Sequence, residues 1–212
     1  MIAVLDYGIG NLRSAQKALL HVGADAQLVT SAAEAVGAAG VVLPGVGNFG
    51  ACAAALRQSG LDRAVLDAVA AGTPMLGVCV GFQLLFGSSE ESPGVAGLGI
   101  FDGTVARLAG AEKLPQMQWN ALDRVPGRDS ALLAGLEEHP WFYFVHSYAP
   151  VPTGPSRAAV VATCDYGGAV TAMVERDNCF GTQFHPEKSG ESGLAVLAAF
   201  AARCGAVPTV RT

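Results

Sequence analysis

A cysteine set between two glycines, with an apolar segment on each side, constrains this chain more than any other feature. The run from Pro74 to Val78 is short and apolar, as in a strand buried in a parallel sheet. Phe82 to Phe86 continues with residues of helical character. Between them, Gly77-Val78-Cys79-Val80-Gly81 is typical of a nucleophile elbow, a strained strand-to-helix turn that presents its central side chain. A cysteine that only packs is the alternative, so the elbow needs a base elsewhere in the chain.

The N-terminal half alternates short apolar strands with helical patterns. Strands are predicted at 2–5, 26–29, 41–43 and 74–78, and helices at 12–22, 49–58, 61–71 and after the elbow. Ser31 is predicted to cap a helix, with Glu34 as its capping-box partner. The alternation predicts an α/β fold with an open, mainly parallel, doubly wound sheet flanked by helices. Ligands bind at the carboxyl ends of such strands, where the loops after Leu5, Leu43 and Val78 lie.

The C-terminal half predicts an antiparallel extension of this sheet. Its strands are expected at 103–108, 119–125, 141–148, 158–164, 169–175 and 179–184, with hairpin turns at Gly167-Gly168 and Asp177-Asn178. A last helix over 192–203 is expected to bury Leu194, Leu197, Ala198 and Ala201. We expect a single domain over residues 1–205 and a frayed tail over 206–212.

Composition excludes several classes of protein. The chain has 212 residues and a net charge of -5, without a basic run, which argues against nucleic acid as a partner. Its five cysteines are scattered and form no CxxC pair, so we expect neither disulfides nor a thiolate metal site, but a reducing cytosol. The N-terminus lacks the basic region of a signal peptide. Two long uncharged stretches, 35–56 and 68–89, are interrupted by Gly and Pro, as buried α/β units are and membrane spans are not.

A histidine near the C-terminus supplies a base for the elbow cysteine. In Phe184-His185-Pro186-Glu187, the histidine and glutamate are two residues apart, so on extended backbone they point the same way. Glu187 can then orient the imidazole while the other ring nitrogen of His185 takes the proton of Cys79. Alone, this pair could be an ordinary hydrogen bond. Together with the elbow, it predicts a catalytic triad of Cys79, His185 and Glu187.

Gly-x-Cys-x-Gly-x-Gln-x-Leu at 77–85, followed by Phe-His-Pro-Glu at 184–187, resembles the class I glutamine amidotransferases. These enzymes release ammonia from glutamine through a cysteinyl thioester. The resemblance implies the fold of that class and a site without metal or cofactor. It also implies a glutamine pocket with oxyanion donors, formed by Gly45, Val46, Gly47, Val80, Gln83, Ser147 and Tyr148. Because glycines flank Val46, we expect its peptides to rotate at low steric cost, which would let a partner switch one donor on.

Further blocks, among them Pro44-Gly45-Val46-Gly47, Met117-x-Trp119-Asn120 and Glu187-Lys188-Ser189, are similar to the members that work with a separate (β/α)8-barrel cyclase. This resemblance implies a heterodimer in which the cyclase docks on Asn11, Lys17, Trp119, Asn120, Tyr143 and Lys188. The chain departs from the usual Pro-His-Met-Gly-Trp-Asn block, because Gln116 and Gln118 replace the histidine and the glycine.

Three alternatives stay open from the sequence. The chain could be the glutaminase of another synthase, such as those of pyridoxal phosphate or anthranilate synthesis. It could also be a non-catalytic subunit with a relic site, or a stand-alone cysteine hydrolase of the same fold. The other cysteines are interpreted as packing residues, Glu90 and Glu91 as part of a solvated loop, and His146 as a candidate for a supporting role.

Overall fold

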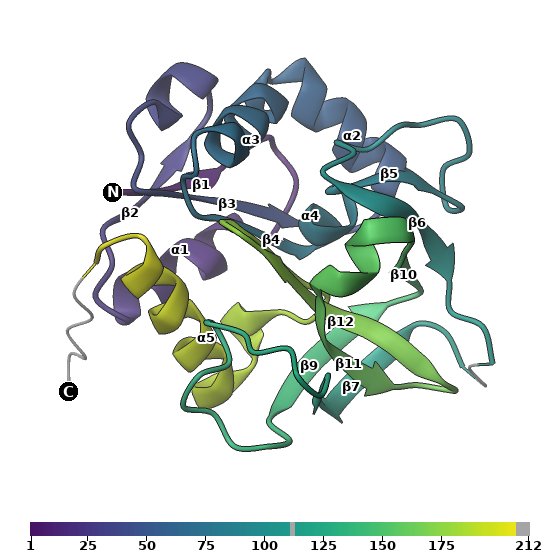
Figure 1. Cartoon of the computed structure of the whole chain (residues 1–212). Helices are drawn as coiled ribbons and strands as arrows, with labels where there is room; N and C mark the ends of the chain where they lie inside the picture. Colours follow the sequence, from purple (N-terminus) through teal and green to yellow (C-terminus); the bar gives the residue numbers. More distant parts are fainter. Residues whose placement is uncertain (111–112, 207–212) are drawn as a thin grey trace.

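The computed structural model describes residues 1–110 and 113–206. An eight-stranded sheet crosses the molecule (Figure 1). Its order is β2 (Ala26–Val29), β1 (Ile2–Leu5), β3 (Gly40–Gly45), β4 (Met75–Cys79), β13 (Cys179–Thr182), β12 (Ala169–Arg176), β11 (Val160–Asp165) and β8 (Asp123–Arg124). The first five strands of this order are parallel and the last three join antiparallel. The predicted sheet and its antiparallel extension are therefore confirmed.

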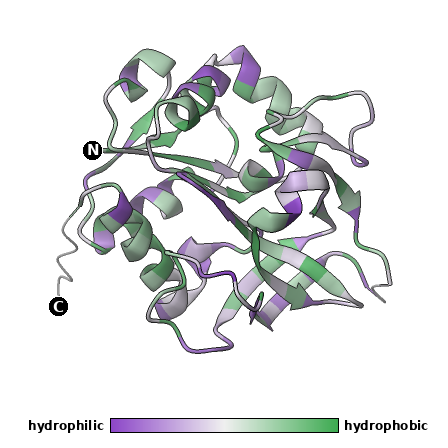
Figure 2. Cartoon of the chain, in the orientation of Figure 1, coloured by the Kyte–Doolittle hydropathy of each residue, from purple (hydrophilic) through white to green (hydrophobic). Residues whose placement is uncertain are grey.

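Helices cover both faces of the parallel strands. Figure 1 shows α2 (Phe49–Gln58) and α3 (Leu61–Ala70) on one face, and α1 (Leu12–His21) and α5 (Gly190–Arg203) on the other. Figure 2 shows hydrophobic residues along β1 and β3, whose side chains are buried between these layers. In α5 the buried residues include Val196 and Phe200, whereas Leu194 and Ala198, which we expected to be buried, are only partly covered.

Two small sheets extend the fold beyond the C-terminal strands. One has the order β10 (Tyr148–Pro152), β6 (Phe101–Arg107) and β5 (Phe86–Ser89), and the other pairs β7 (Gln116–Ala121) with β9 (Trp141–His146). The strand expected over 119–125 is thus two strands, and the one expected over 141–148 ends at His146 before β10 begins. Three 3₁₀ turns, Ala32–Ala35, Gly154–Ala159 and Pro186–Lys188, complete the described elements.

The helix expected after the elbow is much shorter than its apolar pattern suggests. The helix α4 (Val80–Gln83) has a single turn, and Phe86 already opens β5 opposite Phe101. The two phenylalanine rings stack with centroids 5.6 Å apart, so burial against a distant strand outweighs local helical preference. The capping box was also wrong, because the Ser31 side chain makes no cap bond and Glu34 accepts instead from the Thr30 N–H at 2.9 Å.

The two long uncharged stretches fold as expected, one into β3 and α2 and the other into β4, α4 and β5. Among the described helices, none combines the length and the apolar character needed to span a membrane. Most of the tail that we expected to fray, residues 207–212, lies outside the described residues.

Candidate active site

Cys79 stands at the end of β4 in a backbone conformation that side chains rarely adopt. Its φ is 54° and its ψ is -111°, as expected of a strained elbow. Glycine at position 81 is required for close packing, because a Cβ there would overlap the Leu43 carbonyl oxygen. The elbow therefore packs directly on the backbone of β3. This packing places the cysteine at the carboxyl end of the sheet.

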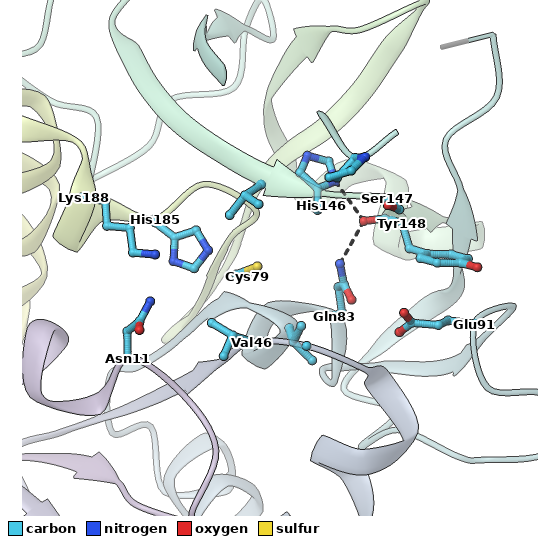
Figure 3. A pocket seen from close by; sticks show the side chains of 14 residues that line it. Asn11, Val46, Cys79, Gln83, Glu91, His146, Ser147, Tyr148, His185 and Lys188 are labelled. Atoms are coloured by element: carbon cyan, nitrogen blue, oxygen red, sulfur yellow. Dashed lines mark hydrogen bonds between the residues drawn. The ribbon is translucent and has the colours of Figure 1, made fainter. Parts of the chain in front are cut away.

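His185 and Glu187 form a buried pair beside the cysteine. His185 follows β13, and Glu187 lies in the 3₁₀ turn that begins at Pro186. The His185 Nδ1–H donates to Glu187 Oε1 over 2.8 Å, and the two side chains are only 1% and 4% exposed. Among the described residues, His185 Nε2 has no hydrogen-bond partner. Figure 3 shows the ring beside the Cys79 sulfur, so Nε2 is the nitrogen available to the thiol.

The surroundings of His185 favour its charged form. Burial alone would lower the pKa of this imidazole, but its interactions with Cys79 and Glu187 outweigh burial and raise the pKa to about 10. A charged His185 carries a proton on each ring nitrogen, one bonded to Glu187 and the other available to the Cys79 sulfur (Figure 3). The three side chains therefore have the contacts of a nucleophile, a base and an orienting carboxylate.

Two glutamines connect the cysteine to the neighbouring strands. Gln83 in α4 donates from Nε2 to the Tyr148 carbonyl at 2.9 Å and to Gln183 Oε1 at 3.1 Å. Gln183 in turn donates to Cys79 Sγ at 3.7 Å and is fully buried. Our sequence analysis assigned no role to Gln183, since nothing in its local pattern separates it from a packed core residue.

The end of β3 and the segment that follows it are held by buried side chains. The Tyr7 hydroxyl donates to the Pro44 carbonyl at 2.7 Å, and the Cys52 thiol donates to the Val46 carbonyl at 3.3 Å. Cys52 is therefore more than a packing residue, because it fixes one peptide of the expected oxyanion segment. Gly47, which follows Val46, has a φ of +89°, and a Cβ added there would meet open space.

The N-terminus of α2 corrects our interpretation of the acidic stretch that contains Glu91. Its first three N–H groups donate to Glu91 Oε2 at 2.7 Å, Ser92 Oγ at 3.0 Å and Asn48 Oδ1 at 3.0 Å. Side chains thus satisfy all three backbone donors. Glu91 also lines the pocket described next, so our interpretation of this acidic stretch as a merely solvated loop was wrong.

A cavity of about 400 Å³ opens over the cysteine (Figure 3). It is lined by Asn11, Val46, Gly47, Cys79, Val80, Gln83, Glu91, Pro115, Val145, His146, Ser147, Tyr148, His185 and Lys188. The structure therefore brings together nearly all residues expected around the cysteine. Two expected residues do not line the cavity: Gly45 lies buried against Gly81 and Tyr7, and Glu187 is bonded to the far nitrogen of His185.

The residues expected to dock a partner divide into three groups. Asn11 and Lys188 line the cavity itself. Trp119 is 48% exposed and meets Tyr143 edge to face, with ring centroids 6.3 Å apart. Asn120 donates to the Asp165 carbonyl and so faces β11, and Lys17, exposed on α1, does not line the cavity. Gln118, which stands where the usual block has glycine, is exposed on β7, so its larger side chain lies at the surface.

The doubly wound sheet and the elbow cysteine with its His-Glu pair define a class I glutamine amidotransferase. Residues 3–204 match the family model described as glutamine amidotransferase class-I, so the chain belongs to this family. Within the family, it is a HisH subunit of imidazole glycerol phosphate synthase by similarity to curated relatives of that name. It is 51% identical to the protein of Methanothermobacter thermautotrophicus over 201 residues, which cover 94% of this chain and 97% of the relative. It is 46% identical to that of Mycobacterium tuberculosis over 200 residues, covering 94% and 96%.

Solved structures share the fold at lower identity. A crystal structure of a glutamine amidotransferase superposes with a TM-score of 0.75 and 21% identity, over 96% of this chain and 98% of the other. The structure of PurLQS from Thermotoga maritima gives a TM-score of 0.74 and 23% identity, over 94% and 96%. At these identities the likeness concerns the fold alone.

Proposed function

We propose that this chain hydrolyses glutamine to glutamate and ammonia and delivers the ammonia to a (β/α)8-barrel cyclase, with which it forms imidazole glycerol phosphate synthase in histidine biosynthesis. The observation that carries the proposal is the convergence of Cys79, His185 and Gln83 on one cavity, with Glu187 bonded to His185. Similarity to HisH subunits over nearly the whole chain supports the particular pathway.

Glutamine would bind with its carboxamide at Cys79 and its amino-acid end toward Gln83, Ser147 and Tyr148. Glu91 adds a carboxylate to this wall, of which only Oε2 is used by the Phe49 N–H. Its second oxygen can attract the substrate's α-ammonium group. This gives Glu91 a role in binding that the sequence did not suggest.

The reaction would begin with attack of the Cys79 thiolate on the carboxamide carbon. The Val80 N–H and an N–H of the Val46–Gly47 segment would stabilise the oxyanion. His185 gives its proton to the leaving nitrogen as the C–N bond breaks, which releases ammonia and leaves a thioester. His185 then takes a proton from water, whose oxygen attacks the thioester. The C–S bond breaks, and glutamate and the thiolate are released.

The ammonia would pass to the cyclase across the surface formed by Asn11, Trp119, Tyr143 and Lys188. The cyclase would use it on a phosphoribosyl-formimino carboxamide ribonucleotide, giving imidazole glycerol phosphate and an aminoimidazole carboxamide ribotide. We assign residues 1–205 to one domain and place the protein in the cytosol, consistent with its unpaired cysteines.

The test is glutaminase turnover of the chain alone, with a barrel cyclase, and with the cyclase and its nucleotide substrate. We expect stable copurification, glutamate release and formation of imidazole glycerol phosphate from glutamine. Glutamate release without product from the cyclase would assign the chain to another synthase. Absence of glutamate release in all three mixtures would reject a glutaminase.

A further inference from the structure

Two buried polar side chains lie opposite each other beside the cavity. Gln116 on β7 is the register partner of His146 on β9, so both project to the same face of this two-stranded sheet. Gln116 is 0% exposed and His146 is 7% exposed. Within the part of the chain that the structure describes, Gln116 Oε1 and His146 Nε2 have no hydrogen-bond partner. A buried polar atom without a partner is costly, so this pair of atoms needs an explanation.

The protonation of His146 follows from its other nitrogen. Nδ1 lies 2.9 Å from the Tyr148 carbonyl oxygen, which can only accept, so Nδ1 carries the proton. Burial lowers the pKa of His146 to about 4, against the opposing effect of the Tyr148 bond. The ring is therefore neutral near pH 7, and its Nε2 is an acceptor that requires a donor.

Gln116 can supply this donor. A carboxamide has a donor end and an acceptor end of nearly the same shape, and half a turn about its last bond exchanges them. The end of Gln116 that faces the Cys164 sulfur lies 3.8 Å from it. Burial raises the pKa of Cys164 to about 11, so the thiol keeps its hydrogen and can donate to an oxygen in that place. This orientation would leave the Gln116 NH₂ free for Nε2 of its register partner His146 and would satisfy both partnerless atoms.

The Tyr148 carbonyl connects His146 to the active site. It accepts from His146 and also from Gln83 Nε2 at 2.9 Å, and Figure 3 shows both bonds meeting at this oxygen. Gln83 continues the path to Cys79 through Gln183. We propose that Gln116 is a positioning residue: it donates to His146 Nε2, fixes the tautomer that holds the Tyr148 carbonyl, and thereby places Gln83 in the glutamine pocket. This role rests on the proposed glutaminase function.

Two substitutions test the proposal. Gln116→Met keeps the length of the side chain and removes the donor, so we expect the KM for glutamine to rise about tenfold while kcat changes less than threefold. Gln116→Glu replaces the donor by an acceptor, so His146 should protonate at Nε2 as well and titrate well above pH 4. Gln118→Met and Gln118→Glu are matched controls, because Gln118 is exposed on the same strand.

The readouts are steady-state kinetics of the complex and ¹⁵N-histidine NMR of the chain, which reports tautomer and pKa without any turnover. In the unmodified chain we expect the proton of His146 on Nδ1 and no protonation down to about pH 5. A His146 proton on Nε2, or the same His146 titration in Gln116→Glu as in Gln118→Glu, would overturn the proposal. If the unmodified complex has no glutaminase activity, the proposed function is rejected, whereas the NMR result on the Gln116–His146 hydrogen bond remains valid. If Gln116→Glu does not fold, two measurements still test the proposal: the tautomer of His146 in the unmodified chain and the KM for glutamine of Gln116→Met.

Discussion

Gly45 lies directly opposite Cys79 in the parallel register of β3 and β4. The strand that leads into the expected oxyanion segment thus ends beside Cys79, and the carbonyl groups of Pro44 and Val46 are held by Tyr7 and Cys52. The separation between the expected oxyanion segment and the sulfur is therefore set by packing between two backbones. For this reason, adding a side chain at Gly45 should have a larger effect than adding one at Gly47.

Gly45→Ala should be more harmful than Gly47→Ala. A Cβ at position 45 would lie 2.6 Å from the Gly81 nitrogen and 2.9 Å from the Tyr7 hydroxyl oxygen, so the elbow would have to shift, at about 1–3 kcal/mol. A Cβ at position 47 meets open space and adds only the strain of a positive φ, about 1 kcal/mol. Urea unfolding of both variants, with glutaminase turnover of the complexes, measures the difference. Equal losses of stability would show that the contact with Gly81 does not limit this position.

Cys79→Ala should abolish glutamine hydrolysis and spare synthesis from added ammonium salts. In the proposed mechanism the sulfur is the nucleophile, whereas cyclisation belongs to the partner, so the glutamine-dependent rate should fall at least about 10³-fold. Product formation by the complex is measured once with glutamine and once with ammonium chloride at alkaline pH. A matched control, Cys179→Ala, removes a buried thiol that does not line the cavity. Equal loss of both reactions in Cys79→Ala would contradict this division of labour.

The sequence predicted the triad because its residues stand in local motifs with their own backbone signals. It did not point to Glu91 and Gln183, whose contacts join distant segments: Glu91 accepts from the N–H of Phe49, 42 positions away, and Gln183 donates to the sulfur of Cys79, 104 positions away. The same limit explains the short α4, since Phe86 is drawn into a strand by Phe101 and not by its neighbours in the chain. Local periodicity contains no information about such partners.

Glu187→Gln should lower kcat more than it raises KM. The amide can donate to His185 Nδ1, which favours the tautomer with its proton on Nε2 and leaves no base for the thiol. We expect kcat to fall by roughly 10²–10⁴, less than in His185→Ala, with unfolding stability within about 2 kcal/mol of the unmodified chain. Stopped assays over a range of glutamine concentrations separate the two constants. Turnover equal to that of the unmodified complex would reduce Glu187 to a structural neighbour.

Lys188→Ala should weaken docking or stimulation by the cyclase without changing the fold. Lys188 is exposed and lines the cavity. It directly follows Glu187, so a partner that contacts Lys188 could shift the backbone of the expected triad. Affinity is measured by titration calorimetry, and stimulation by glutaminase turnover with and without the cyclase. Arg63→Ala is the control, because Arg63 is equally a surface cation but pairs with Asp67 on α3, outside the cavity. If both variants bind and respond like the unmodified chain, Lys188 lies outside the interface.

Stability should fall in mild acid because of His146. Its folded-state pKa is lowered to about 4 by burial, with the neighbouring His185 adding to the effect, while an unfolded histidine titrates near 6.5. Between these values the unfolded chain binds a proton that the folded chain does not. The contribution of His146 is therefore fully present above about pH 6.5 and is lost as the pH falls to about 4, by about 3 kcal/mol. His146→Asn keeps an N–H for the Tyr148 carbonyl but cannot titrate. The difference in unfolding free energy between the two proteins should therefore shift by about 2.5 kcal/mol between pH 7.5 and pH 4.5. A difference independent of pH would mean that His146 titrates alike in the folded and the unfolded chain.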